Sequence, residues 1–240
     1  MKEYLLLTGA SSGIGRQCAI QLSKDYNLIL CARREENLIE TKNLCNNSDN
    51  HLIFKCDLSD ISTIDEKLNN FLIQNDIVVS RFLHCAGCLT LLPAKGFDYE
   101  LCIKTFNTNV FSAMAIMKVL LKKNNKKALK NVVLISALYS KKGVVGNSVY
   151  ASSKGALDSF MRCMAKELAP NVRVNSILPG GVETEITMTT PQEQKEIMMK
   201  DYPLGFGQTE DVANMAEFLF SDKSKWITGQ QFSVDGGASA

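Results

Sequence analysis

Short apolar segments alternate along this chain with longer segments in which apolar residues recur every three or four positions. The short segments predict buried strands at residues 4–7, 27–31, 52–56, 78–84, 131–136, 173–178 and 231–234. The longer segments predict helices at residues 16–24, 35–46, 61–74, 99–122, 148–168 and 210–220. Nearly continuous apolar runs are typical of parallel strands that helices cover on both faces. The alternation therefore predicts an α/β fold, a doubly wound parallel β-sheet in a single domain over residues 1–240, with its ligand at the carboxyl ends of the strands.

A glycine-rich loop joins the first predicted strand to the first predicted helix. Its sequence is Thr8-Gly9-Ala10-Ser11-Ser12-Gly13-Ile14-Gly15. Glycine permits a tight turn and a close approach of the backbone, and the amino end of a helix offers unpaired N–H groups to an anion. A strand, a glycine loop and a helix in this order predict a site for the pyrophosphate of a dinucleotide. The candidate contacts are Gly9, Ser11, Ser12, Gly13, Ile14 and Gly15.

A tyrosine and a lysine lie one helical turn apart at Tyr150 and Lys154. Residues at this spacing share a helix face, so their polar ends can converge. A nearby cation favours the phenolate, which makes the tyrosine usable as a proton donor and acceptor. Such a pair alone also occurs on solvated helices, but its combination with the glycine loop favours an active site.

These two segments and several others resemble the short-chain dehydrogenase/reductase family. The further matching motifs are Cys56-Asp57-Leu58, Cys85-Ala86-Gly87, Asn107-Thr108-Asn109-Val110, Pro179-Gly180-Gly181-Val182-Glu183-Thr184, Ile227-Thr228-Gly229-Gln230 and Val234-Asp235-Gly236-Gly237. The resemblance extends over essentially the whole chain and implies a Rossmann fold, a nicotinamide cofactor and hydride transfer to a carbonyl. It suggests 3-oxoacyl-carrier-protein reductases first, and leaves reductases of sugars or secondary metabolites open.

The resemblance also implies roles for individual residues. Tyr150 would donate a proton to the substrate oxygen, and Lys154 would lower the pKa of Tyr150 and hold the nicotinamide ribose. The main-chain carbonyl of Asn109 would hold a water joined to the lysine. These roles make Tyr150, Lys154 and Asn109 candidate catalytic residues.

The family's serine, thirteen positions before the tyrosine, is missing, because that position is Ala137. Ser136 lies one residue early, and a shift of one residue turns a strand side chain to the opposite face. A local bulge could bring Ser136 into the catalytic role. Ser140 or Tyr139 could supply the hydroxyl instead, or no hydroxyl serves.

The end of the second predicted strand favours NADP(H) as the cofactor. Dinucleotide folds that prefer NAD carry an acidic residue about 20 positions after the glycine loop. Here Arg33 and Arg34 follow the strand, and guanidinium groups pair with a 2′-phosphate and stack on adenine. The alternatives are two solvated arginines, or NAD with Glu35 and Glu36 facing the ribose.

Further cofactor contacts are implied by the resemblance alone. Asp57 matches an adenine-contacting aspartate, although it could equally cap a helix. His84 and Cys85 replace both asparagines of the family's Asn-Asn-Ala-Gly, and His84 is interpreted as a packed side chain. The implied contacts, besides Tyr150 and Lys154, are Asp57, Leu58, Ala86, Gly87, Pro179, Gly180, Val182 and Thr184.

Residues 185–207 are expected to cap the substrate. Met188, Met198, Met199, Tyr202 and Pro203 would form an adaptable apolar wall there. Plain helix packing is the alternative role of these side chains.

Composition excludes several other classes of function. The 240 residues are 45% hydrophobic and 22% charged, with a net charge of +2, which favours no nucleic-acid or membrane partner. No apolar stretch reaches the ~20 residues of a membrane span, and the first strand begins too early for a signal peptide. Eight cysteines in apolar segments indicate reduced thiols and a cytoplasmic protein. No metal site is predicted.

The sequence thus predicts an NADPH-dependent reductase that converts a carbonyl to a secondary alcohol. A non-catalytic NADP-binding protein of the same fold is the alternative, and an epimerase or dehydratase is disfavoured at this chain length. The resemblance implies a homotetramer, or a dimer. Surplus apolar residues support a second buried helix face, namely Phe111, Met114, Phe160, Met161 and Met164.

Overall fold

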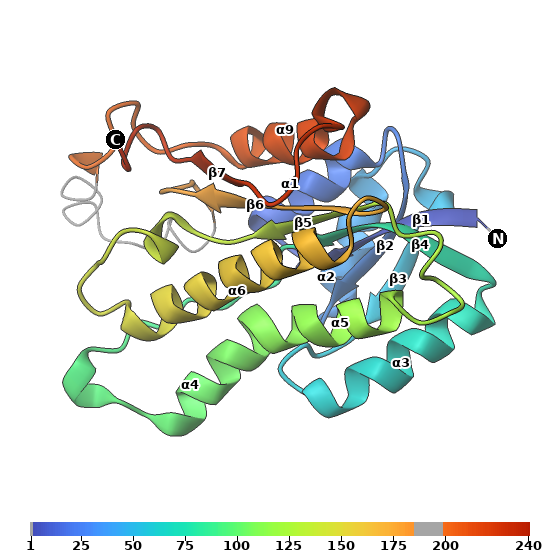
Figure 1. Ribbon diagram of the computed structural model, residues 1–240, viewed down its shortest axis with the longest axis horizontal. Coiled ribbons are helices and arrows are strands. Elements are labelled where there is room, and N and C mark those ends of the chain that lie inside the picture. The colour runs from blue at the N-terminus through green and yellow to red at the C-terminus, as the bar shows by residue number, and fades with distance from the viewer. Residues whose placement is uncertain (1, 185–198) are drawn as a thin grey trace.

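The computed structural model describes residues 2–184 and 199–240. Its centre is a seven-stranded parallel sheet with the strand order β3-β2-β1-β4-β5-β6-β7 (Figure 1). The order reverses between β1 and β4, which confirms the predicted doubly wound fold. The strands are β1 (Lys2–Thr8), β2 (Asn27–Ala32), β3 (Leu52–Lys55), β4 (Ile77–His84), β5 (Asn131–Ile135), β6 (Arg173–Pro179) and β7 (Gln231–Val234).

Helices cover both faces of this sheet (Figure 1). One layer contains α1 (Gly13–Leu22), α2 (Glu35–Leu44) and α9 (Thr209–Phe220). The other layer contains α3 (Ile61–Gln74), α4 (Tyr99–Phe106), α5 (Ser112–Leu120) and α6 (Ser148–Glu167).

Alternation along the strands produces two apolar cores, one under each helix layer. In β1, Leu5 and Leu7 pack with α1 and α9, whereas Tyr4 and Leu6 pack with the opposite layer. Successive strand side chains point to opposite faces, so a strand covered on both sides is apolar throughout. This explains why the strands were recognisable as continuous apolar runs.

The helix predicted at residues 99–122 is divided in the structure. A π-helical turn at Asn107–Phe111 separates α4 from α5. Such turns insert one extra residue into a helix and are frequent at functional sites. Apolar periodicity alone did not reveal the turn, because α4 and α5 continue on either side of it.

The structure buries only some of the apolar residues that were expected to form a second buried helix face. Met161 is fully buried in the core, and Phe160 and Met164 pack at the border of that core. Phe111 and Met114 are exposed. Three of the five residues are therefore accounted for within one subunit, and the homotetramer stays a prediction.

Two further properties concern only the described part of the chain. None of its helices combines the length and hydropathy needed to cross a bilayer. None of its clusters of histidine, cysteine, aspartate and glutamate could hold a metal ion.

Candidate active site

The glycine loop lies against the carboxyl end of β4, next to the reversal of strand order. Gly9 has a φ of 70°, and a Cβ atom there would come within 2.7 Å of the Ala86 nitrogen. A Cβ on Gly15 would come within 2.1 Å of the Gly9 carbonyl oxygen. Any larger residue would displace the loop from β4. These glycines therefore place the amino end of α1 at the edge where a ligand is expected.

The amino end of α1 is suited to an anion. Ser12 is the N-cap residue, and its side chain makes no capping hydrogen bond with the described residues. The first turn of α1 contains no acidic residue. Unpaired N–H groups and the positive end of the helix dipole are thus directed out of the loop. This arrangement fits a pyrophosphate.

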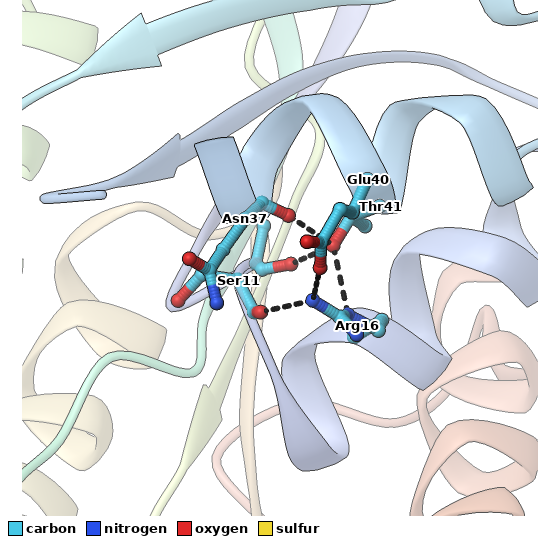
Figure 2. A network of polar contacts seen from close by, with 6 residues as sticks. Ser11, Arg16, Asn37, Glu40 and Thr41 are labelled. Atoms are coloured by element: carbon cyan, nitrogen blue, oxygen red, sulfur yellow. Dashed lines mark hydrogen bonds and ion pairs between the residues drawn. The ribbon is translucent and has the colours of Figure 1, made fainter. Parts of the chain in front are cut away.

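A network of polar contacts around Arg16 ties the glycine loop to α2 (Figure 2). The Arg16 guanidinium donates to the Ser11 carbonyl at 2.7 Å and to the Thr41 hydroxyl at 3.1 Å. It also forms an ion pair with Glu40 at 3.0 Å. Because the guanidinium reaches three partners, it couples the shape of the loop to the position of α2.

Thr41 makes the remaining contacts of this network, both through its hydroxyl group. Its hydroxyl is fully buried and lies 2.9 Å from the Ala10 carbonyl and 3.0 Å from the Asn37 carbonyl. The sequence analysis did not identify Arg16 or Thr41. A polar residue on the buried stripe of α2, one turn after Leu38, was the signal that could have revealed Thr41.

Arg33 and Arg34 lie where β2 meets α2, and both are exposed. Their guanidinium groups form no hydrogen bond or ion pair with the described residues. Glu35 faces Lys55 instead, with 3.4 Å between the charged atoms. The acidic residue that follows the arginines in the sequence is thereby paired, which disfavours its use for a ribose.

Asp57 follows β3 and accepts hydrogen bonds from the main chain and the hydroxyl of Ser59, at 2.9 and 2.8 Å. Partial burial raises the pKa of Asp57, but these bonds and the charges of Arg33 and Lys104 outweigh burial, so the net pKa is lowered. Asp57 thus stabilises a local turn and also lies near Arg33. The neighbouring Leu58 is buried in the core.

Asn109 is fully buried in the π-helical turn and bonds to two other segments. Its side-chain oxygen accepts from the Cys88 N–H at 2.8 Å. Its amide donates to the Cys88 carbonyl at 3.1 Å and to the Ser153 hydroxyl at 3.0 Å. Asn109 therefore joins the loop after β4 to α6.

Lys154 and Asn109 flank Gly87. A Cβ on Gly87 would lie 3.3 Å from the Lys154 Nζ and 3.4 Å from the Asn109 Oδ1. Lys154 is only 3% exposed, and its ammonium donates to the Ile135 carbonyl at 2.8 Å. Its Nζ lies 5.8 Å from the centre of the Tyr150 ring. The structure thus brings three of the four candidate catalytic residues, Tyr150, Lys154 and Asn109, to one edge of the sheet.

The pKa values of the tyrosine and the lysine shift in opposite directions. Burial lowers the pKa of Lys154 to about 8, although Cys85, Asp158 and Cys88 oppose this shift. Burial also raises the pKa of Tyr150, together with Tyr139 and the two cysteines. Lys154 was expected to lower the pKa of Tyr150, and this expectation is wrong for the described geometry. The ammonium points to the Ile135 carbonyl, and burial of the phenol dominates.

The Ser136 hydroxyl is directed to the main chain of α6. It follows Val132 and Leu134 on the strand face that packs against α6, and its hydroxyl donates to the Lys154 main-chain carbonyl at 3.3 Å. The pairing of β5 with β6 continues without a bulge to Ile135. A regular strand therefore keeps Ser136 on the α6 side, and the structure does not bring its hydroxyl to Tyr150.

Two other hydroxyl groups lie beyond Ala137. The Ser140 hydroxyl oxygen is buried and bonds to no described residue. Tyr139 lies close enough to contribute to the raised pKa values of both Tyr150 and Tyr202, after burial. These positions correspond to the two alternatives that the sequence left open.

The loop after β6 packs tightly over the site. A Cβ on Gly180 would lie 2.8 Å from the Tyr202 ring, and one on Gly181 would lie 2.7 Å from the Phe206 ring. Beyond this loop, Val182 pairs with Gly207, and Thr184 lies next to Gly13. The loop after β6 thus meets the glycine loop across the expected cofactor position.

Only part of the expected capping segment can be placed. Met188 and Met198 lie outside the described residues. Tyr202 is buried, and Met199 is exposed. The rings of Tyr202 and Phe206 pack edge to face at 5.2 Å, so Tyr202 supports the loop after β6.

A separate cavity lies at the opposite edge of the sheet. It has a volume of about 360 Å³ and is lined by Glu3, Tyr26, His51 and Arg81, among others. It contains none of the candidate catalytic or cofactor residues and has no part in the site described above.

A sequence model described as enoyl-(acyl carrier protein) reductase matches residues 9–239. The 3-oxoacyl-[acyl-carrier-protein] reductase FabG of Thermotoga maritima is 30% identical over 98% of this chain and 97% of that protein. The corresponding reductase of Homo sapiens is 32% identical over 99% of this chain and 98% of that protein. The chain belongs to the short-chain dehydrogenase/reductase family. The resemblance seen in the sequence is thereby confirmed, and the protein is an oxidoreductase of this family.

Solved structures of short-chain dehydrogenase/reductase proteins support the fold and the class of cofactor. The structure of ElxO with NADP bound is 26% identical, with a TM-score of 0.89 and coverage of 100% of this chain and 99% of that chain. A 4-hydroxyisoleucine dehydrogenase complexed with NADH and succinate is 25% identical, with a TM-score of 0.88 and coverage of 98% and 99%. One neighbour binds NADP and the other NADH, so the neighbours favour a nicotinamide cofactor without choosing between the two.

Replacing Thr41 by valine should loosen the glycine loop. The change removes the acceptor of the Arg16 Nε and the donor to the Ala10 carbonyl while it keeps the volume of the side chain. We expect a loss of about 1–3 kcal/mol in the free energy of unfolding, because buried polar groups lose their partners. We also expect weaker binding of a nicotinamide dinucleotide in calorimetry. Thr41→Ser, which keeps the hydroxyl, is the control, and equal stability of the Val and Ser variants would contradict this role.

Proposed function

We propose that this protein is an NADPH-dependent reductase that converts a ketone to a secondary alcohol. The observation that carries this proposal is the arrangement of Lys154 and Asn109 on either side of Gly87, with the Tyr150 ring centre 5.8 Å from the Lys154 Nζ. The glycine loop and the amino end of α1 fit a pyrophosphate, and Lys154 fits the ribose next to the nicotinamide.

Proton transfer is assigned to Tyr150 and Lys154. When bound, the reduced nicotinamide supplies the hydride that the substrate carbonyl carbon accepts. The Tyr150 hydroxyl donates its proton to the carbonyl oxygen, which leaves an alcohol and a tyrosinate. An ammonium group has three N–H donors. One of them bonds to Ile135, so two remain for the tyrosinate and the ribose.

The substrate that we favour is a 3-oxoacyl thioester of a carrier protein, because the curated relatives over the full chain are named for that reaction. The matching family model is described as an enoyl reductase, which reduces a carbon–carbon double bond instead. A phenol placed to protonate an oxygen supports the ketone. A non-catalytic NADP-binding protein is the second candidate, because Ala137 stands where the family carries its serine.

The reductase proposal is tested by following NADPH absorbance with acetoacetyl and crotonyl thioesters and a panel of simple ketones. We expect turnover with the acetoacetyl thioester and a loss of at least about a hundredfold in Tyr150→Phe, as for removal of a general acid. The affinity for NADPH should not change in that variant. Turnover of the crotonyl thioester alone would favour enoyl reduction. NADPH binding without any turnover would favour the non-catalytic protein.

NADPH should bind at least about tenfold more tightly than NADH, a difference of ~1.4 kcal/mol. The guanidinium groups of Arg33 and Arg34 are exposed and pair with no described residue, which favours the 2′-phosphate, and Glu35 forms an ion pair with Lys55. Arg33→Asp should reverse the preference in calorimetric titrations. Lys24→Asp makes the same change in net charge at the opposite edge of the sheet and should leave the preference unchanged. Equal affinities of the unmodified protein for both cofactors would contradict NADP specificity.

Ser140 is proposed to polarise the substrate carbonyl in place of the family's serine, because its buried hydroxyl is not used by any described residue. Ser140→Ala should lower kcat by ~10²–10³, the typical cost of one oxyanion donor. Ser136→Ala should change kcat only a few-fold, because its hydroxyl is bonded to α6. Tyr139→Phe tests the second alternative. If kcat falls only in Tyr139→Phe or Ser136→Ala, the assignment to Ser140 is wrong.

A further inference from the structure

Two buried charges of opposite sign lie one turn apart on α6. Among the side chains that the structure describes, Lys154 and Asp158 are the only buried ones of lysine, arginine, aspartate and glutamate, with exposures of 3% and 2%. Residues four positions apart share a helix face. Asp158 is therefore the next residue on the face that carries Tyr150 and Lys154. Neither the family resemblance nor the mechanism above gives it a role.

Each of these charged groups bonds to a neutral partner. The Lys154 ammonium donates to the Ile135 carbonyl at 2.8 Å. The Oδ1 atom of Asp158 accepts from the Ser176 hydroxyl of β6 at 2.9 Å. The Oδ2 atom is buried and bonds to no described residue. Hydrogen bonds from the described residues thus satisfy only half of the carboxylate, and its charge acts on Lys154 through space.

The apolar surroundings of Asp158 strengthen this interaction. Leu157 and Met161, which precede and follow Asp158 on α6, are fully buried in the core. Two charges attract each other several times more strongly in a protein interior than in water. A buried ammonium and a buried carboxylate also offset the cost that each incurs when it loses its hydration.

The end of β4 and the loop after it place other titratable groups near Lys154. Burial lowers the pKa of Lys154 to about 8, whereas Cys85, Asp158 and Cys88 act in the opposite direction. Burial raises the pKa of the Cys85 thiol to about 12, so this thiol is neutral at the pH of the reaction. Burial and Lys154 lower the pKa of His84 to about 3, so the imidazole is neutral as well.

The other elements that pack against α6 add no carboxylate close to Lys154. The turn after β5 contributes Tyr139, which acts on the phenol of Tyr150. In α4, Glu100 and Lys104 are exposed. In β6, the one titratable residue is Arg173 at the first position, and β5 has none. The aspartate of α6 is thus the only carboxylate among the groups around the ammonium.

Resting on the proposed function, we propose that Asp158 is a positioning residue that keeps Lys154 protonated. Once Tyr150 has given its proton to the substrate oxygen, the tyrosinate is stabilised by a cation beside it. A neutral amine on Lys154 would supply no such charge. The Asp158 carboxylate favours the ammonium form, and it acts on the reaction only through Lys154.

The variant Asp158→Asn separates this role from packing. The asparagine keeps the shape of the side chain and an oxygen that accepts from Ser176, but it removes the negative charge. Loss of that charge lowers the pKa of Lys154, so the ammonium is lost at a lower pH. We expect the alkaline decline of kcat to move down by about one pH unit or more, a tenfold change in the acid dissociation constant of Lys154. In numbers, kcat should fall about fivefold or more at pH 8 and less than about twofold at pH 6.

Ser176→Ala is the matched control, because it removes the bond between β6 and Asp158 and keeps the charge. We expect its alkaline decline of kcat to stay where it is in the unmodified protein. An equal displacement in both variants would attribute the effect to the bond between α6 and β6 and would overturn the proposal. An unchanged profile in Asp158→Asn, or an equal loss of kcat at both pH values, would also overturn it.

A ¹³C NMR titration of the lysine side chains measures the same pKa without turnover. The signal of Lys154 is the one that is missing from the spectrum of Lys154→Met. We expect its midpoint near pH 8 in the unmodified protein. In Asp158→Asn, the midpoint should be lower by about one pH unit or more.

Equal midpoints in the two proteins would contradict the proposal. A midpoint below about pH 6 in the unmodified protein would contradict it without any use of the Asp158 variant, because the lysine would then be neutral near pH 7. If the midpoints differ as expected but no ketone is reduced, the proposed function fails and the coupling of Asp158 to Lys154 stands.

Discussion

The close contact between the glycine loop and the end of β4 is the constraint on which the rest of this site depends. No side chain fits at Gly9 or Gly15, because a Cβ would overlap backbone atoms at 2.7 and 2.1 Å. With the loop in this position, α1 begins directly over the sheet edge, and Arg16 can reach α2. The position of α2 then determines where Arg33 and Arg34 emerge. The lack of space for a side chain at these two glycines therefore fixes the position of the glycine loop, on which the start of α1 depends.

The other half of the site contains a buried cation, the ammonium group of Lys154. Removing an ammonium from water is costly unless oxygen atoms replace its hydration. Lys154 meets this requirement partly through the Ile135 carbonyl, and burial lowers its pKa to about 8. Asn109 holds the adjoining backbone in place, and the π-helical turn brings Asn109 to the level of Cys88. Burial lowers the pKa of Lys154 and raises that of Tyr150, and the hydrogen bond to the Ile135 carbonyl offsets part of the cost of burying the ammonium.

The fold and the family were predictable from the sequence because their signals are local. Continuous apolar runs predicted strands covered on both faces. The glycine loop predicted that a helix begins at the edge of the sheet. The spacing of Tyr150 and Lys154 guaranteed a common helix face. The division of the helix at residues 99–122 was missed, because an inserted residue preserves the apolar pattern on both sides of the turn.

Tertiary structure decided the contacts that join distant segments. The sequence left Ser136, Ser140 and Tyr139 as alternatives, and only the packing of β5 against α6 directed the Ser136 hydroxyl to the Lys154 carbonyl. Arg16 and Thr41 bond to each other and to the glycine loop because α2 lies next to that loop. His84 was interpreted as a packed residue, and the structure buries it completely, with its Nδ1 atom 3.0 Å from the Thr8 hydroxyl oxygen. Periodicity and spacing describe neighbours along one element, whereas the partner of a buried polar atom depends on which elements lie side by side.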